Sequence, residues 1–146
     1  MNERFESYLD SIGLSASILK ECVERTYKYS SKLCPEKIED LFVNDFIKED
    51  KSREYSSLWF FSKCYLMEVR NFRNANEYDI DIARIADWLS YYRISFKDYD
   101  LVESSETSSM KVECSNSDGI GFVLQASREN CNKLTSIIET YLKASI

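Results

Sequence analysis

The sequence contains no histidine, only three glycines and a single proline. Without histidine the chain lacks the commonest general base and the commonest zinc ligand, so Ser-His-Asp and Cys-His catalytic arrangements cannot form within it. Three glycines are too few for the usual phosphate-binding loops. These absences favour a protein that is not an enzyme, with no catalytic residue, no cofactor and no bound metal.

Long apolar runs and a signal pattern are also missing. No stretch approaches the roughly 20 apolar residues of a membrane span, and residues 1–5 lack the basic-then-apolar pattern of a secretory signal. The five cysteines are odd in number and widely spaced, without a CxxC pair, which is typical of reduced thiols in a cytoplasmic protein. We therefore predict a cytoplasmic location and no membrane span.

Positive charge is in deficit, with 19 basic against 25 acidic residues and a net charge of −6. An acidic chain without a basic run repels phosphate backbones and anionic membrane surfaces. Nucleic acid is therefore an unfavourable partner, and a protein partner or a second copy of the chain is favoured.

The last third of the chain has the clearest pattern. Apolar residues alternate with polar ones before and after Asn116–Gly119, which indicates two strands joined by a tight turn at Asp118-Gly119. Ser127 is placed to cap a following helix. Apolar residues then recur at helical spacing, at Cys131, Leu134, Ile137, Ile138, Tyr141 and Leu142.

The remainder predicts two helices, at 5–12 and 15–32, followed by short strands. Strands are expected at 41–47 and within 55–70, with a bend at Ser62-Lys63. Segment 78–97 fits strands better, although Ile82 to Leu89 also fits a helical face. A further strand is expected at 99–102 and a polar loop at 103–109.

This order of elements predicts an α+β fold in a single domain, residues 1–146. Residues 1–34 form a helical N-terminal extension, and residues 40–143 form a β-rich body. That body is a mainly antiparallel sheet, or a partly open barrel, of six to eight short strands closed by a C-terminal amphipathic helix.

Consecutive antiparallel strands sealed by a C-terminal helix resemble the pleckstrin-homology-like superfold over about residues 40–143. The resemblance implies a binding module, since relatives bind phosphoinositides or peptides or act as rigid protein contacts. Its lipid-binding members use a basic pocket near the first strands. Here residues 44–51 are mixed in charge, which argues against that activity.

Three groups of residues are candidates for function. The main group is a cluster of aromatic residues. Because neighbouring residues of a strand point to opposite faces of the sheet, either both faces are covered or some of these aromatic rings are exposed as a contact surface. The acidic pairs Asp79/Asp81 and Asp98/Asp100 have the spacing to share a cation on a strand, and Ser17 and Lys20 match a Ser-x-x-Lys spacing. The possible binding surface comprises Trp59, Phe61, Trp88, Tyr91 and Tyr92.

Three functions follow. The first is a non-enzymatic intracellular domain that binds another protein or itself. The second is a small acidic inhibitor or immunity-type protein that masks a basic toxin or nuclease. The third is a metal-dependent enzyme that uses paired carboxylates. The missing histidine, the missing motifs, the acidic charge and the surplus of aromatic residues all fit the first function.

Overall fold

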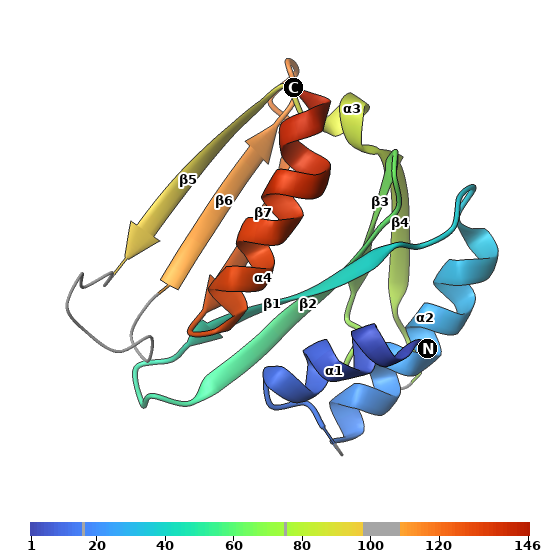
Figure 1. Cartoon of the computed structure of the whole chain (residues 1–146), viewed down its shortest axis with the longest axis vertical. Helices are drawn as coiled ribbons and strands as arrows, with labels where there is room; N and C mark the ends of the chain where they lie inside the picture. Colours follow the sequence, from blue (N-terminus) through green and yellow to red (C-terminus); the bar gives the residue numbers. More distant parts are fainter. Residues whose placement is uncertain (16, 75, 98–108) are drawn as a thin grey trace.

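The computed structural model describes residues 1–15, 17–74, 76–97 and 109–146 (Figure 1). The helices are α1 (Glu3–Ser11), α2 (Ile18–Leu33), α3 (Ile85–Trp88) and α4 (Asn130–Ile137), and α4 continues through a π-helical turn (Ile138–Leu142) and a 3-10 turn (Lys143–Ser145). The strands are β1 (Asp40–Ile47), β2 (Arg53–Phe61), β3 (Tyr65–Arg70), β4 (Asp79–Arg84), β5 (Tyr91–Lys97), β6 (Ser109–Ser115) and β7 (Gly121–Ser127).

The seven strands of the described residues form two open antiparallel sheets. Strands β1-β2-β3-β4 make the first sheet and β5-β6-β7 the second, and within each sheet every strand pairs with the next one along the chain. The predicted α+β class, the antiparallel pairing and the closing helix are thereby confirmed. No helix in the described part of the chain is long and apolar enough to cross a membrane.

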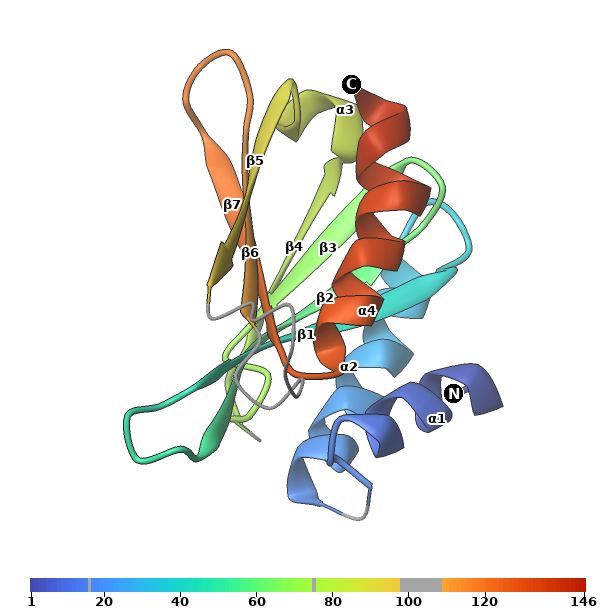
Figure 2. The same ribbon diagram turned by 60° about the vertical axis from the view of Figure 1, so that its left-hand side comes forward.

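The first sheet is a middle layer with both faces covered. Helices α1 and α2 lie on one side of this sheet, and α4 and the second sheet lie on the other (Figure 2). On β2, Phe60 packs in the cluster with α1 and α2, whereas Trp59 and Phe61 pack in the cluster with the second sheet and α4. This explains the dense aromatic run, because a strand buried on both faces needs apolar residues at every position. Trp59 and Phe61 are 2% and 0% exposed, so they are core residues and not part of an exposed surface.

Helix α4 covers one open end of the two-sheet sandwich (Figure 1). The six residues predicted for its apolar face are all buried. The predicted cap is wrong: Glu129 precedes the helix without a side-chain capping bond, and the Ser127 hydroxyl donates to Asp45 instead. A hydrogen bond to an ionised carboxylate is stronger than a neutral capping bond, which accounts for the difference.

Segment 78–97 is mainly strand, as expected, with β4 and β5 separated by the single helical turn α3. The predicted strand at 99–102 lies outside the described residues, as do Asp98, Asp100 and most of the predicted loop. Ser109, assigned to that loop, is the first residue of β6.

Side chains join the two sheets where β1 meets β7. Asn44 donates through Nδ2 to the Val123 carbonyl (3.0 Å) and accepts through Oδ1 from the Gln125 amide (3.2 Å). The Asn44 side chain thus supplies hydrogen bonds between β1 and β7 where paired strands would form them between backbone groups. The pairing register of β1 shifts between Asn44 and Asp45. Ser57 and Tyr55 stand opposite these two residues, so the extra residue of the bulge lies on β2, and Asn44 and Asp45 both form hydrogen bonds with β7.

Candidate functional site

A small pocket opens between the two sheets, away from the part of the sandwich that α4 fills. Its volume is about 100 Å³. This is well below the roughly 300–1,000 Å³ of pockets that hold metabolite-sized ligands, so the pocket accommodates one side chain or a similarly small group. It is lined by Trp59, Leu66, Glu68, Asp81, Ala83, Trp88, Gly121 and Phe122.

The floor of the pocket is a cross-strand row on the first sheet. Trp59 on β2 pairs with Glu68 on β3, which pairs with Asp81 on β4. Directly opposed residues of an antiparallel sheet project on the same face with Cβ atoms about 5 Å apart. The register therefore places an aromatic ring and two carboxylates side by side.

Aromatic side chains form the walls. Trp59 and Phe122 lie against each other, with ring centroids 5.1 Å apart, and the Trp59 indole donates to the Ser57 hydroxyl (3.0 Å). These contacts hold Trp59 as the back wall. Trp88, on α3, is half-buried and forms the accessible wall. Both tryptophans of the chain thus line this one pocket.

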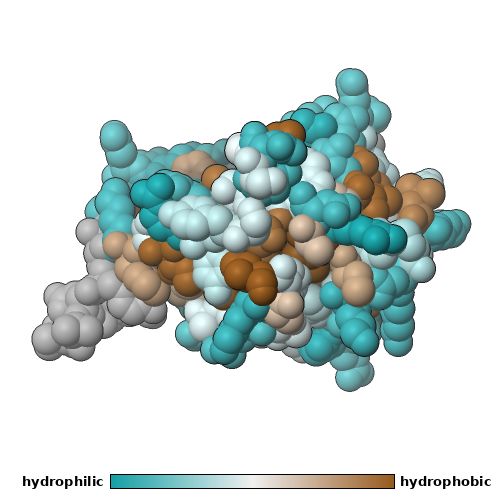
Figure 3. All heavy atoms as spheres, turned by 90° about the horizontal axis from the view of Figure 1, so that it is seen from above, coloured by the Kyte–Doolittle hydropathy of each residue, from teal (hydrophilic) through white to brown (hydrophobic). Residues whose placement is uncertain are grey.

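The remaining residues of the predicted aromatic surface lie at the start of β5. Tyr91 is 55% exposed, and Tyr92 is half-buried against the core. Neither lines the pocket. Hydrophobic residues reach the surface at the end of the molecule where α3 and the C-terminus lie, and hydrophilic residues border them (Figure 3). Trp88, Tyr91 and Tyr92 therefore remain candidates for contact, while Trp59 contributes only through the pocket.

The two carboxylates of the pocket differ in their surroundings. Asp81 is exposed and forms an ion pair with Arg70 (3.0 Å). Glu68 is half-buried, and no hydrogen bond or ion pair joins its carboxylate to another described residue. Burial raises the pKa of Glu68, the charge of Arg70 lowers it, and the weaker effect of Asp81 raises it again. The pocket therefore holds a carboxylate that burial alone destabilises and that no ion pair compensates.

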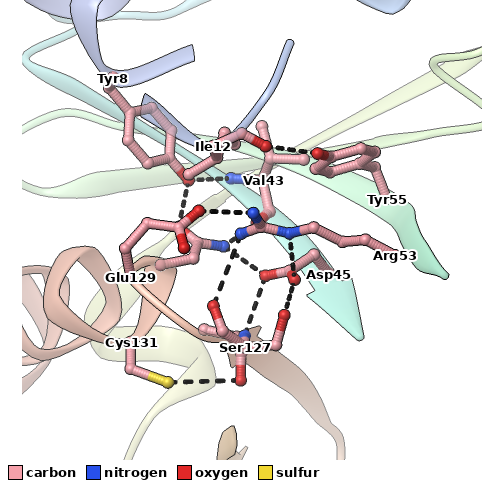
Figure 4. A network of polar contacts seen from close by, with 11 residues as sticks. Tyr8, Ile12, Val43, Asp45, Arg53, Tyr55, Ser127, Glu129 and Cys131 are labelled. Carbon is pink, nitrogen blue, oxygen red and sulfur yellow. Dashed lines mark hydrogen bonds and ion pairs between the residues drawn. The ribbon is translucent and has the colours of Figure 1, made fainter. Parts of the chain in front are cut away.

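A second polar cluster is deeply buried and belongs to the architecture (Figure 4). Asp45, fully buried on β1, accepts from Arg53 Nε (2.8 Å), from the Ser127 amide (3.0 Å) and from Asn130 Nδ2 (2.6 Å). Arg53 also donates to Glu129 (2.5 Å). The cluster thereby fastens β1 and β2 to the corner between β7 and α4.

Helix α1 is attached to the same cluster. The Tyr8 hydroxyl donates to Asn130 Oδ1 (2.7 Å) and accepts from the Val43 amide (3.0 Å), and burial raises the pKa of Tyr8 strongly. Desolvation works against the charge of Arg53, but hydrogen bonds to Asp45 and Glu129 outweigh it and raise its pKa. With its buried polar atoms satisfied in this way, the cluster is a structural lock rather than a reactive centre.

Among the described residues, the other predicted sites do not assemble. Asp79 is exposed at the start of β4, opposite Arg70, and among the described residues no group of three His, Cys, Asp or Glu is placed to hold a metal. Ser17 caps α2 by accepting from the Lys20 amide (3.3 Å), and the Lys20 ammonium lies 3.5 Å from Asp10, so each residue of the Ser-x-x-Lys pair has a structural partner.

The turn between β1 and β2 is where the resemblance places a lipid-binding pocket. A shallow hollow of about 570 Å³ lies there, lined by residues 46–50. Lys48 and Lys51 are balanced by Glu49 and Asp50. Hydrogen bonds from Ser52 lower the pKa of Asp50 and keep it anionic. The turn has no excess of positive charge with which to bind a phosphate.

All five cysteines are free thiols that differ in accessibility. Cys64 is exposed, whereas burial raises the pKa of Cys114 to about 12 and of Cys131 to about 11. Because the thiolate is the reactive form, we expect Ellman's reagent at pH 8 to modify Cys64 first and Cys114 and Cys131 only after unfolding. Peptide mapping after a short exposure measures the order, and early labelling of Cys114 would contradict the described packing.

A comparison with models of protein families found no match, and searches of curated proteins and of solved structures also found none.

Proposed function

We propose that the chain is a non-enzymatic domain that binds a protein partner through the open end of its two-sheet sandwich. The observation that carries this proposal is the pocket itself, which is acidic, walled by aromatic rings and large enough for one side chain of a partner. Aromatic anchors in small pockets are typical of the centres of protein interfaces.

Several further features support a binding role. The order of elements fits the resemblance to the pleckstrin-homology-like superfold, whose relatives include protein-contact modules. Five free thiols fit a reducing compartment such as the cytoplasm. The net charge of −6 favours a basic partner, which is the chemistry expected of an inhibitor or immunity-type protein as well.

The test compares partners retained by matched surface variants. We expect native mass spectrometry, on protein isolated at low salt, to show a basic protein with wild type that is lost with Trp88→Ala. Ile18→Ala is the control, because Ile18 is 74% exposed on α2, which packs on the opposite face of the first sheet. High salt should release the partner, because its attraction is electrostatic.

Four outcomes would contradict the proposal. A partner retained equally by Trp88→Ala would place the interface elsewhere, and one lost only with Ile18→Ala would place it on α2. A second copy of this chain, in place of another protein, would indicate self-association. A melting temperature raised by Mg²⁺ or Mn²⁺ would favour the paired-carboxylate enzyme.

A further inference from the structure

The chemistry of the pocket identifies the kind of side chain that fills it. Glu68 and Asp81 are directly opposed on neighbouring strands, and like charges in that arrangement are destabilising. Arg70 pairs with Asp81 at 3.0 Å but with Glu68 forms no ion pair. A cation that enters beside Glu68 would pair with a half-buried carboxylate that has no ion-pair partner of its own.

The walls indicate an organic cation rather than a metal ion. Calcium and magnesium ions require about six or more oxygen ligands, whereas this pocket offers two carboxylates among mainly carbon atoms. Trp59 and Trp88 both line the pocket, Trp88 being the more accessible, and cations lie favourably over the face of tryptophan. A flat cation suits such a site best, because a guanidinium group both stacks on aromatic rings and pairs with carboxylates through its planar fork.

We propose that the pocket binds an arginine side chain of the protein partner, with the guanidinium group against Trp88 and paired with Glu68 and Asp81. This inference rests on the proposed function and specifies the chemistry of the contact. The occupant is a residue of another protein and not a free metabolite, because the volume of about 100 Å³ holds one side-chain head and little more.

The chain carries its own reporter for this pocket. Its only two tryptophans both line it, so the two indole N–H signals in a ¹⁵N–¹H NMR spectrum report on the site directly. We expect N-acetyl-arginine methylamide to shift both signals with a dissociation constant in the millimolar range, as befits a single side chain. N-acetyl-citrulline methylamide has nearly the same shape without the charge, and should leave both signals in place.

Two variants test the role of Glu68. Glu68→Gln keeps the shape and removes the charge, and should weaken arginine binding at least tenfold. Glu24→Gln, exposed on α2 on the far side of the first sheet, should bind as wild type does. Since the pKa of Glu68 is raised in the folded state, its ionisation disfavours folding above that pKa. Glu68→Gln should therefore melt at or above the wild-type temperature at neutral pH, which separates lost binding from lost structure.

Each alternative result is decisive. Equal shifts with the arginine and citrulline compounds would show that the pocket does not recognise charge. Tighter binding of N-acetyl-lysine methylamide would show that the pocket takes lysine and not arginine. No shift at tens of millimolar N-acetyl-arginine methylamide would overturn the inference. If the arginine compound causes no shift but the partner protein is still lost with Trp88→Ala, the proposed function stands without the arginine contact. If the arginine compound binds but the partner protein is retained by Trp88→Ala, the proposed function alone is overturned.

Discussion

Replacing Asp45 by alanine is expected to lower the free energy of unfolding by about 3–5 kcal/mol, because removing one partner of a buried ion pair leaves the other charge uncompensated. The Arg53 side chain is only 11% exposed and the Asp45 side chain is 0% exposed. The substitution also removes the acceptor of Ser127 and Asn130. Urea denaturation followed by circular dichroism measures the change.

Asp10→Ala is the matched control for this prediction. Asp10 forms an ion pair with Lys20 at 3.5 Å, but its side chain is 51% exposed. Exposed pairs contribute about 0–1 kcal/mol, so this variant should unfold close to wild type. A loss of less than about 1 kcal/mol for Asp45→Ala would mean that water reaches Arg53 and that the cluster does not hold the sheets together.

The double variant Asp45→Ala/Arg53→Ala distinguishes the ion pair from the other contacts of Asp45. Once both charges are removed, no uncompensated ion remains, so the double variant should be more stable than the sum of the two single losses implies. Strict additivity would assign the effect to the bonds with Ser127 and Asn130 instead.

The strands and the closing helix were predictable because their signals are local. Alternation around Asp118-Gly119 marks β6 and β7, and the positive φ of Gly119 (+80°) is what that turn dipeptide anticipates. The face of α4 follows from helical spacing alone. In these segments the local pattern and the tertiary packing favour the same structure.

The pocket and the buried cluster were not predictable in the same way. Asn44 and Asp45 interrupt an apolar strand, which marks them as unusual, but their partners Val123 and Ser127 lie about eighty residues away. Which face Trp59 occupies depends on the second sheet, whose position no local pattern specifies. The pairing of Glu68 with Asp81 likewise requires the register of β3 on β4.

Gly121→Ala is expected to destabilise the protein by about 3 kcal/mol or more, at the upper end of the cost of overpacking. A Cβ atom at position 121 would lie 1.8 Å from the backbone carbonyl oxygen of Cys114. Because that oxygen belongs to the paired strand β6, a rotamer change cannot relieve the clash, and the hairpin itself must move.

Gly119→Ala, two residues earlier, separates this clash from the general cost of replacing a turn glycine. A Cβ atom there meets no other atom within 4 Å, so only the strain of its positive φ remains, at about 1 kcal/mol. Similar losses in the two variants, measured by urea denaturation, would show that β6 and β7 are not so closely apposed. Gly121 also lines the pocket beside Phe122. The close approach of these strands therefore fixes the β7 wall of the pocket, and any Gly121→Ala protein that folds should bind arginine more weakly than Gly119→Ala.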